Sequence, residues 1–220
     1  MIKAIVFDFD GLIVDTESVW YEVYREMLDE RGVQLPIAEF ASYIGTDTTE
    51  LYNYLERQFA NELTKKEIAK ESLRRHQEKM KTLAAREGVV DYLEEAKALG
   101  LKIGLASSSY RDWVTNFLGE LNLLDYFEVM QTRDDVEKVK PHPALYQNAI
   151  AKLGVLPSEA IAFEDSANGA KAAIAAGLQC VIVPNPLSQH LQFEKYHLRI
   201  ASMKEKKLAD VINTISASLK

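Results

Sequence analysis

The strongest constraint on the fold comes from five short apolar runs, each of which ends in polar or turn-forming residues. The runs lie at residues 2–7, 101–106, 127–132, 160–163 and 180–183. Apolar runs of this length, with turn chemistry at their ends, are typical of strands that are buried on both faces of a sheet. Helical patterns fill most of the chain between them. This alternation predicts an α/β fold built on a mostly parallel sheet with helices on both faces.

Apolar residues at helical spacing, several of them followed by a glycine, predict helices between the strands. These helices are expected at 89–99, 109–121, 146–153, 167–176 and about 207–219. The second of them would open with a capping-box variant formed by Ser109 and Asp112.

The chain between residues 16 and 87 differs, because no strand-like run appears there. It begins with an apolar stripe at helical spacing, and capping-box spacing recurs at Asp47 with Glu50 and at Thr64 with Glu67. These patterns predict an all-helical domain inserted directly after the first strand. The expected division is 1–15 and 88–220 for the sheet domain and 16–87 for the helical domain.

The charge balance and the cysteine count exclude several classes of protein. The 220 residues include 26 lysines and arginines against 33 aspartates and glutamates, a net charge of −7. That balance argues against a surface for nucleic acid or anionic membranes. The single cysteine, Cys180, excludes an internal disulfide framework and a multi-cysteine metal site. No apolar run approaches the roughly 20 residues that span a bilayer, and acids interrupt the apolar start, so we expect a cytoplasmic protein.

Polar side chains stand at the ends of the predicted strands, where an open α/β sheet binds its ligands. They are Asp8, Asp10, Ser107, Ser108, Ser109, Lys140, Glu164 and Asp165. Clustered carboxylates repel one another, and a hard divalent cation such as Mg²⁺ removes that conflict. Phosphate would be attracted next, because serines, the amides at a helix start and a lysine can hold its oxygens. A carboxylate beside bound phosphate is a candidate nucleophile.

Each of these residues also has a plainer structural explanation. Aspartate after a strand is a common turn former, serines cap helices, and a lysine before proline is most often a surface residue. Glu164 and Asp165 could cap the following helix, and Gly169 could merely allow close packing. The combination favours chemistry, because four strand ends carry complementary groups in order.

The stretch FDFDGLIVDTE at residues 7–17 resembles the first motif of the haloacid dehalogenase-like (HAD) superfamily, DxDGxxxDT. LASSS at 105–109 resembles the second motif, Lys140 in VKPHP the third, and FEDSANG at 163–169 the fourth. The likeness covers nearly the whole chain, including a helical insert after the first motif. It implies a Rossmann-like core with a helical cap, in the subgroup that holds β-phosphoglucomutase and many small-metabolite phosphatases.

The resemblance also implies roles for the acidic residues. Asp8 would be the nucleophile that forms an aspartyl phosphate, and Asp10 would be the general acid and base. Mg²⁺ would be held by the Asp8 carboxylate, the Asp10 carbonyl and Asp165. Glu164 would sit at or just outside the metal shell.

The remaining motif residues would bind phosphate or connect the two domains. The transferring phosphoryl group would be gripped by Ser107, the Ser108 amide and Lys140, where stabilisation of charge matters most. Gly11 would belong to a flap leading into the cap. Asp15 and Thr16 would act as hinge and positioning residues.

Differences between this sequence and the motifs of particular family members favour one of the family's reactions over the others. The dehalogenases lack the second acid of the first motif, so the presence of Asp10 favours phosphoryl transfer. Phosphonoacetaldehyde hydrolase needs a cap lysine, and residues 45–50, where it is expected, contain none. Trp20 stands where β-phosphoglucomutase has a histidine, and no arginine stands near Thr48, where that enzyme binds a second phosphate. Hydrolysis is therefore favoured over a mutase reaction.

These observations predict a Mg²⁺-dependent phosphatase of a small phosphorylated metabolite, such as a sugar phosphate or a similar monoester. A phosphosugar mutase and a non-catalytic, metabolite-binding regulator remain as alternatives. Trp20 and Tyr43 are the cap aromatics expected to line the substrate pocket. The four histidines show no ligand spacing and are interpreted as incidental. We expect a monomer that binds a small metabolite and neither nucleic acid nor membranes.

Overall fold

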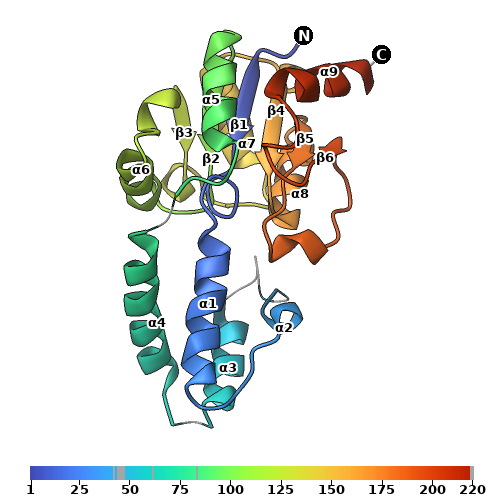
Figure 1. The fold of residues 1–220 in the computed structure, drawn as a ribbon. Helices are drawn as coiled ribbons and strands as arrows, with labels where there is room; N and C mark the ends of the chain where they lie inside the picture. The colour runs from blue at the N-terminus through green and yellow to red at the C-terminus, as the bar shows by residue number, and fades with distance from the viewer. Residues whose placement is uncertain (42, 44–47, 61, 83, 219–220) are drawn as a thin grey trace.

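A six-stranded parallel sheet forms the upper half of the molecule (Figure 1). This computed structural model describes residues 1–41, 43, 48–60, 62–82 and 84–218, and its strands lie in the order β3-β2-β1-β4-β5-β6. The strands are β1 Ala4–Phe7, β2 Lys102–Ala106, β3 Val129–Gln131, β4 Ala160–Glu164, β5 Gln179–Ile182 and β6 Leu198–Arg199. Every pairing is parallel. The predicted α/β fold with a parallel sheet is confirmed.

The register of the strands brings their polar ends to one edge of the sheet. Phe7 of β1 pairs with Leu105 of β2 on one side and with Phe163 of β4 on the other. Asp8 and Glu164 follow these paired positions, so they stand almost level at the carboxyl edge. The chain builds the sheet outward from β1 to β3 and then returns to β4 on the other side of β1. The carboxyl end of β1 is therefore the topological switch point, where open α/β sheets bind their ligands.

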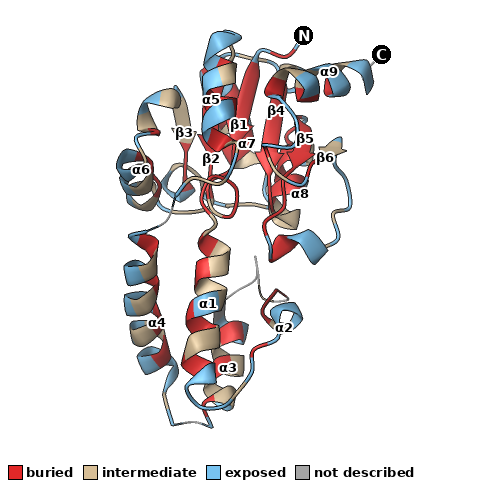
Figure 2. Cartoon of the chain, in the orientation of Figure 1, coloured by how far each residue is buried: buried red, intermediate tan, exposed pale blue. Residues whose placement is uncertain are grey.

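Helices cover both faces of the sheet, and each face has its own apolar core. Ile5 and Phe7 pack on the face covered by α5 (Val89–Ala98), α6 (Arg111–Glu120) and α9 (Leu208–Ser218). Ala4 and Val6 pack on the face covered by α7 (Ala144–Leu153) and α8 (Ala167–Ala175). The alternation follows from strand geometry, in which successive side chains point to opposite faces. Figure 2 accordingly shows the central strands buried throughout.

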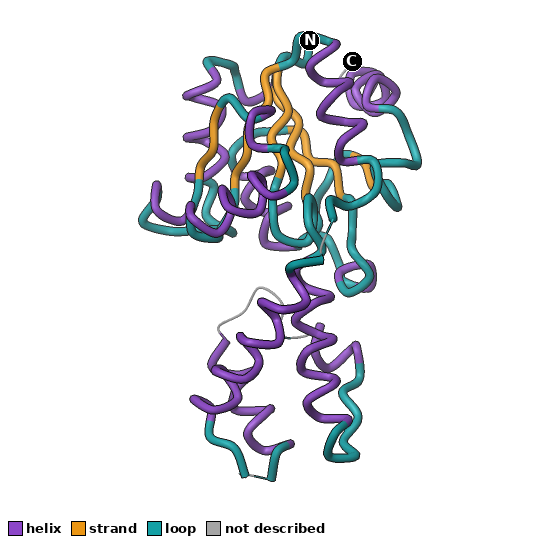
Figure 3. The backbone as a smooth tube through the Cα atoms, turned by 60° about the vertical axis from the view of Figure 1, so that its left-hand side comes forward, coloured by secondary structure: helices purple, strands orange, loops and turns teal. Residues whose placement is uncertain are grey.

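Beyond the carboxyl edge of the sheet, the described residues form four helices in a lobe, here called the helical lobe (Figures 1 and 3). They are α1 Thr16–Asp29, α2 Ile37–Ala41, α3 Thr48–Gln58 and α4 Lys65–Met80, all inside the range 16–87. α4 packs against both α1 and α3. Thr64 and Glu67 form the predicted capping box at the start of α4. The predicted box at Asp47 lies outside the described residues.

Short 3₁₀ helices complete the described part of the chain. They are η1 Leu124–Tyr126, η2 Arg133–Asp135, η3 Pro157–Glu159 and η4 Ser188–His190. Within the described ranges, none of the helices has both the length and the apolar character needed to cross a membrane.

The start of α6 differs from its prediction. The helix begins at Arg111 without a side-chain cap, so the predicted capping box of Ser109 and Asp112 is wrong. The Ser109 hydroxyl instead donates to the Asp10 carboxylate at 2.6 Å. The Arg111 amide donates to Asp134 at 2.7 Å, which satisfies an otherwise free helix-start amide from outside the helix.

Two strands also differ from their predictions. The run 127–132 yields only the three-residue β3, because the chain leaves η1 at Phe127. The two-residue β6 was not predicted, since Leu198 and Arg199 are too few to leave a periodic pattern.

Candidate active site

A cavity of about 570 Å³ opens between the carboxyl edge of the sheet and the helical lobe. The sheet side of its wall includes Asp8, Asp10, Lys140 and Asp165. α1 contributes Thr16, Glu17 and Trp20 from the lobe. The predicted site residues from both parts of the chain therefore meet around one space.

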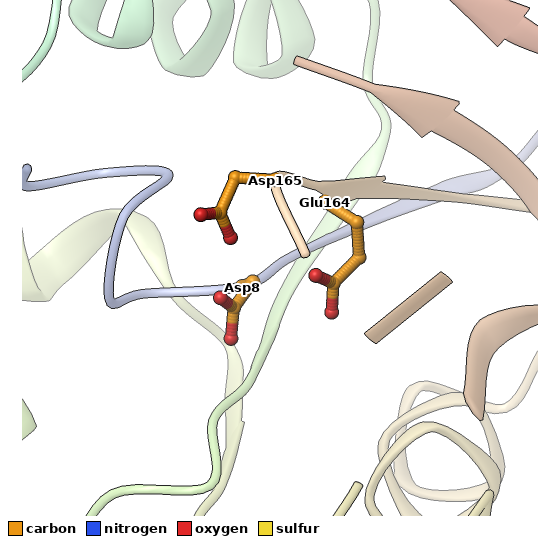
Figure 4. Close-up of side chains that lie close together, drawn as sticks. All are labelled: Asp8, Glu164 and Asp165. Atoms are coloured by element: carbon orange, nitrogen blue, oxygen red, sulfur yellow. The ribbon is translucent and has the colours of Figure 1, made fainter. Parts of the chain in front are cut away.

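Three carboxylates form a buried cluster at the ends of β1 and β4 (Figure 4). Asp8 follows β1, Glu164 ends β4 and Asp165 follows it; each has an oxygen within 4.8 Å of an oxygen of the others. All three residues are buried. Such an arrangement is unfavourable without positive charge, because buried like charges repel one another and lose their hydration.

Lys140 supplies one positive charge to this cluster. Its ammonium lies 2.6 Å from Asp8 Oδ1 and 2.6 Å from Glu164 Oε1, and its side chain is only 5 % exposed. The Tyr146 hydroxyl donates to the same Glu164 oxygen at 2.5 Å. The Ser166 hydroxyl donates to the other Glu164 oxygen at 3.2 Å, so both oxygens of Glu164 have partners within the protein, while Asp8 keeps its second oxygen for other partners.

The remaining imbalance of charge indicates a cation. Burial, opposed by Lys140 and reinforced by Glu164, raises the pKa of Asp8 to about 7. Burial together with Asp8 and Glu164 raises the pKa of Asp165 well above its usual range. Asp165 Oδ2 accepts a hydrogen bond from Asn185 at 2.9 Å, but the buried Oδ1 has no hydrogen-bond partner among the described residues. A buried carboxylate oxygen without a donor is well matched to a divalent metal ion with oxygen ligands.

Asp10 lies beside the cluster and is oriented by three donors. Its Oδ2 accepts from Ser109 Oγ at 2.6 Å and from Ser107 Oγ at 3.5 Å. Its Oδ1 accepts from Trp113 Nε1 at 3.0 Å. The second acid of the first motif is thus held at the cavity wall, separate from the three clustered carboxylates.

The serines after β2 divide into a buried one and two that line the cavity. Ser107 is fully buried, and its hydroxyl accepts from the Ser109 amide at 3.0 Å. Ser108 and Ser109 line the cavity. Ser108 and Lys140 therefore line the same cavity, as a phosphate site would require. Ser107 instead stabilises the turn after β2 through its bond with the Ser109 amide.

Two glycines of the motifs are required by close approach to carboxylates. Gly11 has a φ of +79°, and a Cβ there would collide with the Asp165 carboxylate. A Cβ on Gly169 would collide with Glu164. Gly169 therefore does allow close packing, but the group that packs against it belongs to the site itself.

The residues predicted to form the hinge and the substrate pocket lie in different surroundings. Asp15 caps α1 by accepting from the Ser18 amide at 3.1 Å, and the buried Thr16 lines the cavity. Trp20 also lines the cavity, and its contact with a substrate stays a prediction. Tyr43 is not among the described residues of the cavity wall; its hydroxyl donates to Glu39 at 2.8 Å and its ring lies beside Tyr54. Its assignment to the pocket stays a prediction.

Several site residues were missed by the sequence analysis. Tyr146, Asn185, Glu17 and Trp113 contact the cluster or line the cavity, yet none is at the end of a strand. Burial in the cavity wall, next to Asp10 and Asp15, raises the pKa of Glu17 to about 7. Only Glu17 carried a usable signal, since it continues the first motif.

A second cavity, of about 640 Å³, has a wall that includes Arg86, Glu87 and Arg199. The carboxylate cluster does not contribute to its described wall. The Arg86 guanidinium is already engaged with the carbonyls of Gly11, Val183 and Pro184. The first cavity is therefore the candidate active site.

The fold and the acidic site define an α/β protein with a candidate metal site, and a family comparison makes the assignment specific. Residues 5–183 match the family model described as haloacid dehalogenase-like hydrolase. This chain belongs to that family, as its motifs predicted.

Comparisons with individual proteins agree with the family. The chain is 48% identical over 218 residues to "Putative phosphatase YhcW" of Bacillus subtilis, with 99% of each chain covered. It is 32% identical over 181 residues to "Phosphorylated carbohydrates phosphatase" of Thermotoga maritima, which covers 80% of this chain and 82% of that one. Among solved structures, a HAD family hydrolase from Deinococcus radiodurans R1 with bound phosphate and sodium has a TM-score of 0.82 at 25% identity, over 97% of each chain.

Proposed function

We propose that this protein is a Mg²⁺-dependent phosphatase that hydrolyses a small phosphorylated carbohydrate through an aspartyl phosphate. The observation that carries the proposal is the buried cluster of Asp8, Glu164 and Asp165, with Lys140 and Asp10 around one cavity. The relatives named as phosphatases support the reaction, and one of them is named for phosphorylated carbohydrates. The carbohydrate substrate of this chain is inferred from that name.

The residues present fit a divalent metal ion. The free oxygen of Asp8, the unpartnered Oδ1 of Asp165 and the carbonyl of Asp10 would hold it, with Glu164 beside them. When bound, Mg²⁺ would neutralise charge on the phosphoryl oxygens and offset the repulsion between the carboxylates.

Asp8 would attack phosphorus, forming a bond from its carboxylate oxygen as the bond from phosphorus to the ester oxygen breaks. Asp10 would give its proton to that ester oxygen, which leaves as the alcohol. Asp10, now ionised, would accept a proton from water as the water attacks the aspartyl phosphate. Inorganic phosphate leaves, and Asp8 is restored. Lys140 and the Ser108 amide would hold the phosphoryl oxygens throughout.

Residues 16–87 would form a cap domain on the sheet domain of residues 1–15 and 88–220. A cap over the cavity would exclude water while the phosphoryl group is transferred, and it would select small substrates. Trp20 and Glu17 face the cavity from this side and would contact the carbohydrate part.

Phosphate release from a panel of compounds tests the proposal. The panel contains hexose and hexitol phosphates, phosphoglycolate, nucleotides and 4-nitrophenyl phosphate, each with Mg²⁺ and with chelator. We expect metal-dependent release, fastest with a hexose or hexitol phosphate. Release that persists in chelator would contradict the metal. Conversion of a hexose 1-phosphate to a 6-phosphate without net phosphate release would instead identify a mutase, and no reaction with metal bound would favour a regulatory binder.

A further inference from the structure

Three aromatic rings stack in series across the boundary between the helical lobe and the sheet domain. The Trp20 indole of α1 lies 3.8 Å from the His76 imidazole of α4, centroid to centroid, with 16° between the ring planes. The Trp113 indole of α6 is the second stacking neighbour of His76, at 5.8 Å between ring centroids and 26° between the ring planes. Two rings of this aromatic stack thus belong to the lobe and one to the sheet domain.

His76 contributes to the aromatic stack only as a ring. It is fully buried, and in the part of the chain that the structure describes neither ring nitrogen has a hydrogen-bond partner. Burial lowers its pKa to about 4, so the imidazole is neutral near pH 7. Because no hydrogen bond orients it, contact with the two indoles fixes the position of His76.

Trp113 connects the aromatic stack to Asp10. Its Nε1 donates to Asp10 Oδ1 at 3.0 Å, and it is the one donor to that oxygen among the hydrogen bonds of the described residues. Ser109 and Ser107 donate to the other oxygen, Oδ2. With both oxygens engaged from opposite sides, the Asp10 carboxylate cannot rotate about its Cβ–Cγ bond without breaking a hydrogen bond.

The indole of Trp113 is not locked by the sheet domain alone. Phe117 contacts it edge-on, at 4.6 Å between ring centroids. A cavity of about 240 Å³ borders Trp113 away from the active site, with Gln77, Met80 and Lys81 in its wall, so the ring has space beside it. The contact with His76 therefore ties this ring to the helical lobe.

We propose that Trp113 is a positioning residue for Asp10 and that the helical lobe controls this positioning through the stack of His76 and Trp20. The proposal rests on the role of Asp10 as general acid and base given above. On this proposal, His76 and Trp20 affect proton transfer without touching the reacting atoms. Proton transfer by a positioned side chain contributes about 10²–10⁴-fold, so partial loss of orientation is expected to cost about tenfold.

Trp113→Phe tests the hydrogen bond, because it keeps an aromatic ring and removes Nε1. Single-turnover release of the leaving group is measured with the fastest alkyl phosphate of the panel and with 4-nitrophenyl phosphate. An alkoxide needs the Asp10 proton to leave, whereas the nitrophenolate does not. We expect alcohol release to slow about tenfold, nitrophenolate release to slow less than about twofold, and KM to stay within about twofold. Equal slowing of both leaving groups would show a general structural defect and would overturn the assignment.

His76 variants test the role of the lobe. His76→Phe keeps a stacking ring and is expected to retain the rate of alcohol release within about threefold. His76→Ala removes the ring and should reproduce the Trp113→Phe pattern. In a double variant, His76→Ala should add less than about twofold to Trp113→Phe, because both changes act through one hydrogen bond. Ser72→Ala, a buried position one turn earlier on α4, is the matched control and should change the rate by less than about twofold.

Fluorescence reports the aromatic stack directly, since Trp20 and Trp113 are the two tryptophans of the sequence. His76→Ala is expected to shift the emission to longer wavelength, while His76→Phe and Ser72→Ala leave it unchanged. If the emission shifts and alcohol release does not slow, the stack exists but does not position Asp10, and the proposal fails.

Asp10→Asn separates this proposal from the proposed function. If Asp10→Asn abolishes turnover of the alkyl phosphate while Trp113→Phe behaves as wild type, only the positioning role is wrong. If Asp10→Asn itself leaves alcohol release unchanged, the role of Asp10 in the proposed function is wrong.

Discussion

At the scale of single residues, the clustered carboxylates of the site outnumber the described positive side chains that act on them. The Lys140 ammonium contacts the buried carboxylates of Asp8 and Glu164, whereas the positive charge that acts on the buried Asp165 is that of Arg86. Burial is the main cause of the raised pKa values of Asp8 and Asp165, and repulsion from the neighbouring carboxylates adds to it. Each substitution in the cluster therefore changes both the chemistry and the electrostatic free energy of the fold.

Asp8→Asn is expected to abolish turnover while preserving the fold. The asparagine side chain has nearly the same shape, and its oxygen can still accept from Lys140, but the amide does not attack phosphorus. We expect phosphate release to fall at least about a thousandfold, with a circular dichroism spectrum like that of the wild type. Residual turnover above that level, in protein shown free of wild type, would remove Asp8 as nucleophile.

Gly169→Ala is expected to destabilise the protein even though alanine favours helices. The added Cβ would collide with the Glu164 carboxylate, which is held by Lys140 and Tyr146 and cannot move away freely. We expect a loss of about 1–3 kcal/mol in the free energy of unfolding, measured by urea denaturation.

Gly119→Ala is the control for this prediction. Gly119 lies in α6, and nothing stands within 4 Å of a Cβ placed there. The same substitution should therefore stabilise the protein by about 0.5–1 kcal/mol. Equal effects at the two glycines would show that Glu164 is free to move.

At the scale of elements, α4 connects the surface of the helical lobe to the active site. Its first turn is closed by the capping box of Thr64 and Glu67. Arg75 and Lys79 reach Glu30 and Glu26 at 2.6 and 2.9 Å, but these ion pairs are partly exposed and contribute little. The buried side of the helix holds Ile68 and His76, so packing rather than surface charge sets its position.

Burial of His76 predicts a specific pH dependence of stability. The pKa is lowered from 6.5 in the unfolded chain to about 4 in the folded one. Between these values the unfolded chain binds a proton that the folded chain does not, so stability is present above pH 6.5 and is lost as the pH falls toward 4. We expect the wild type to lose about 2 kcal/mol relative to His76→Phe between pH 7.5 and pH 5, measured by urea denaturation.

The comparison with His76→Phe isolates this one group, because every other titrating group is shared by the two proteins. A difference between them that stays constant over the pH range would mean that His76 is accessible to water or to a proton donor in the folded state.

At the scale of the whole molecule, two parts of the chain meet at one cavity and are joined by two crossings. The first crossing follows Gly11, and the second is near Arg86. The Arg86 guanidinium donates to the carbonyls of Gly11, Val183 and Pro184 at 2.5, 3.2 and 2.6 Å, and its amide donates to Ile13 at 2.8 Å. Arg86 therefore ties the two crossings to each other and to the loop after β5.

Metal binding is expected to stabilise the whole fold. Because the cluster exists only when β1 and β4 are paired, we expect Mg²⁺ to bind the folded chain in preference to the unfolded one. At a concentration about 100 times its Kd, it should add about 2.7 kcal/mol, which for a chain of this size raises Tm by about 5–10 °C. The measurement is Tm by calorimetry as a function of Mg²⁺ concentration.

Asp165→Asn is the control for the metal effect. It removes charge at the oxygen that lacks a donor, and its Tm should be nearly independent of Mg²⁺ whatever its starting value. A shift in Tm as large as that of the wild type would place the metal elsewhere.

The sequence by itself determined the sheet, its strand ends and the residues that stand there. The strands are local patterns of apolar residues, and parallel strands bring their carboxyl ends to one edge, so Asp8, Lys140, Glu164 and Asp165 could be placed together from order alone. The capping box at Thr64 was equally local. The one at Ser109 failed because a distant partner, Asp10, engages its hydroxyl.

Only the tertiary structure decided which side chains outside the motifs complete the site. Tyr146 and Asn185 reach the carboxylates from a helix face and a loop, and Trp20, His76 and Trp113 come together from three helices. The spacing of residues in the sequence does not predict such contacts, because they depend on how helices cross and which faces they bury. His76 was interpreted as incidental, because a single histidine forms no recognisable sequence pattern. Its contacts with two indoles follow only from the packing of α4 against α1 and from the approach of α6.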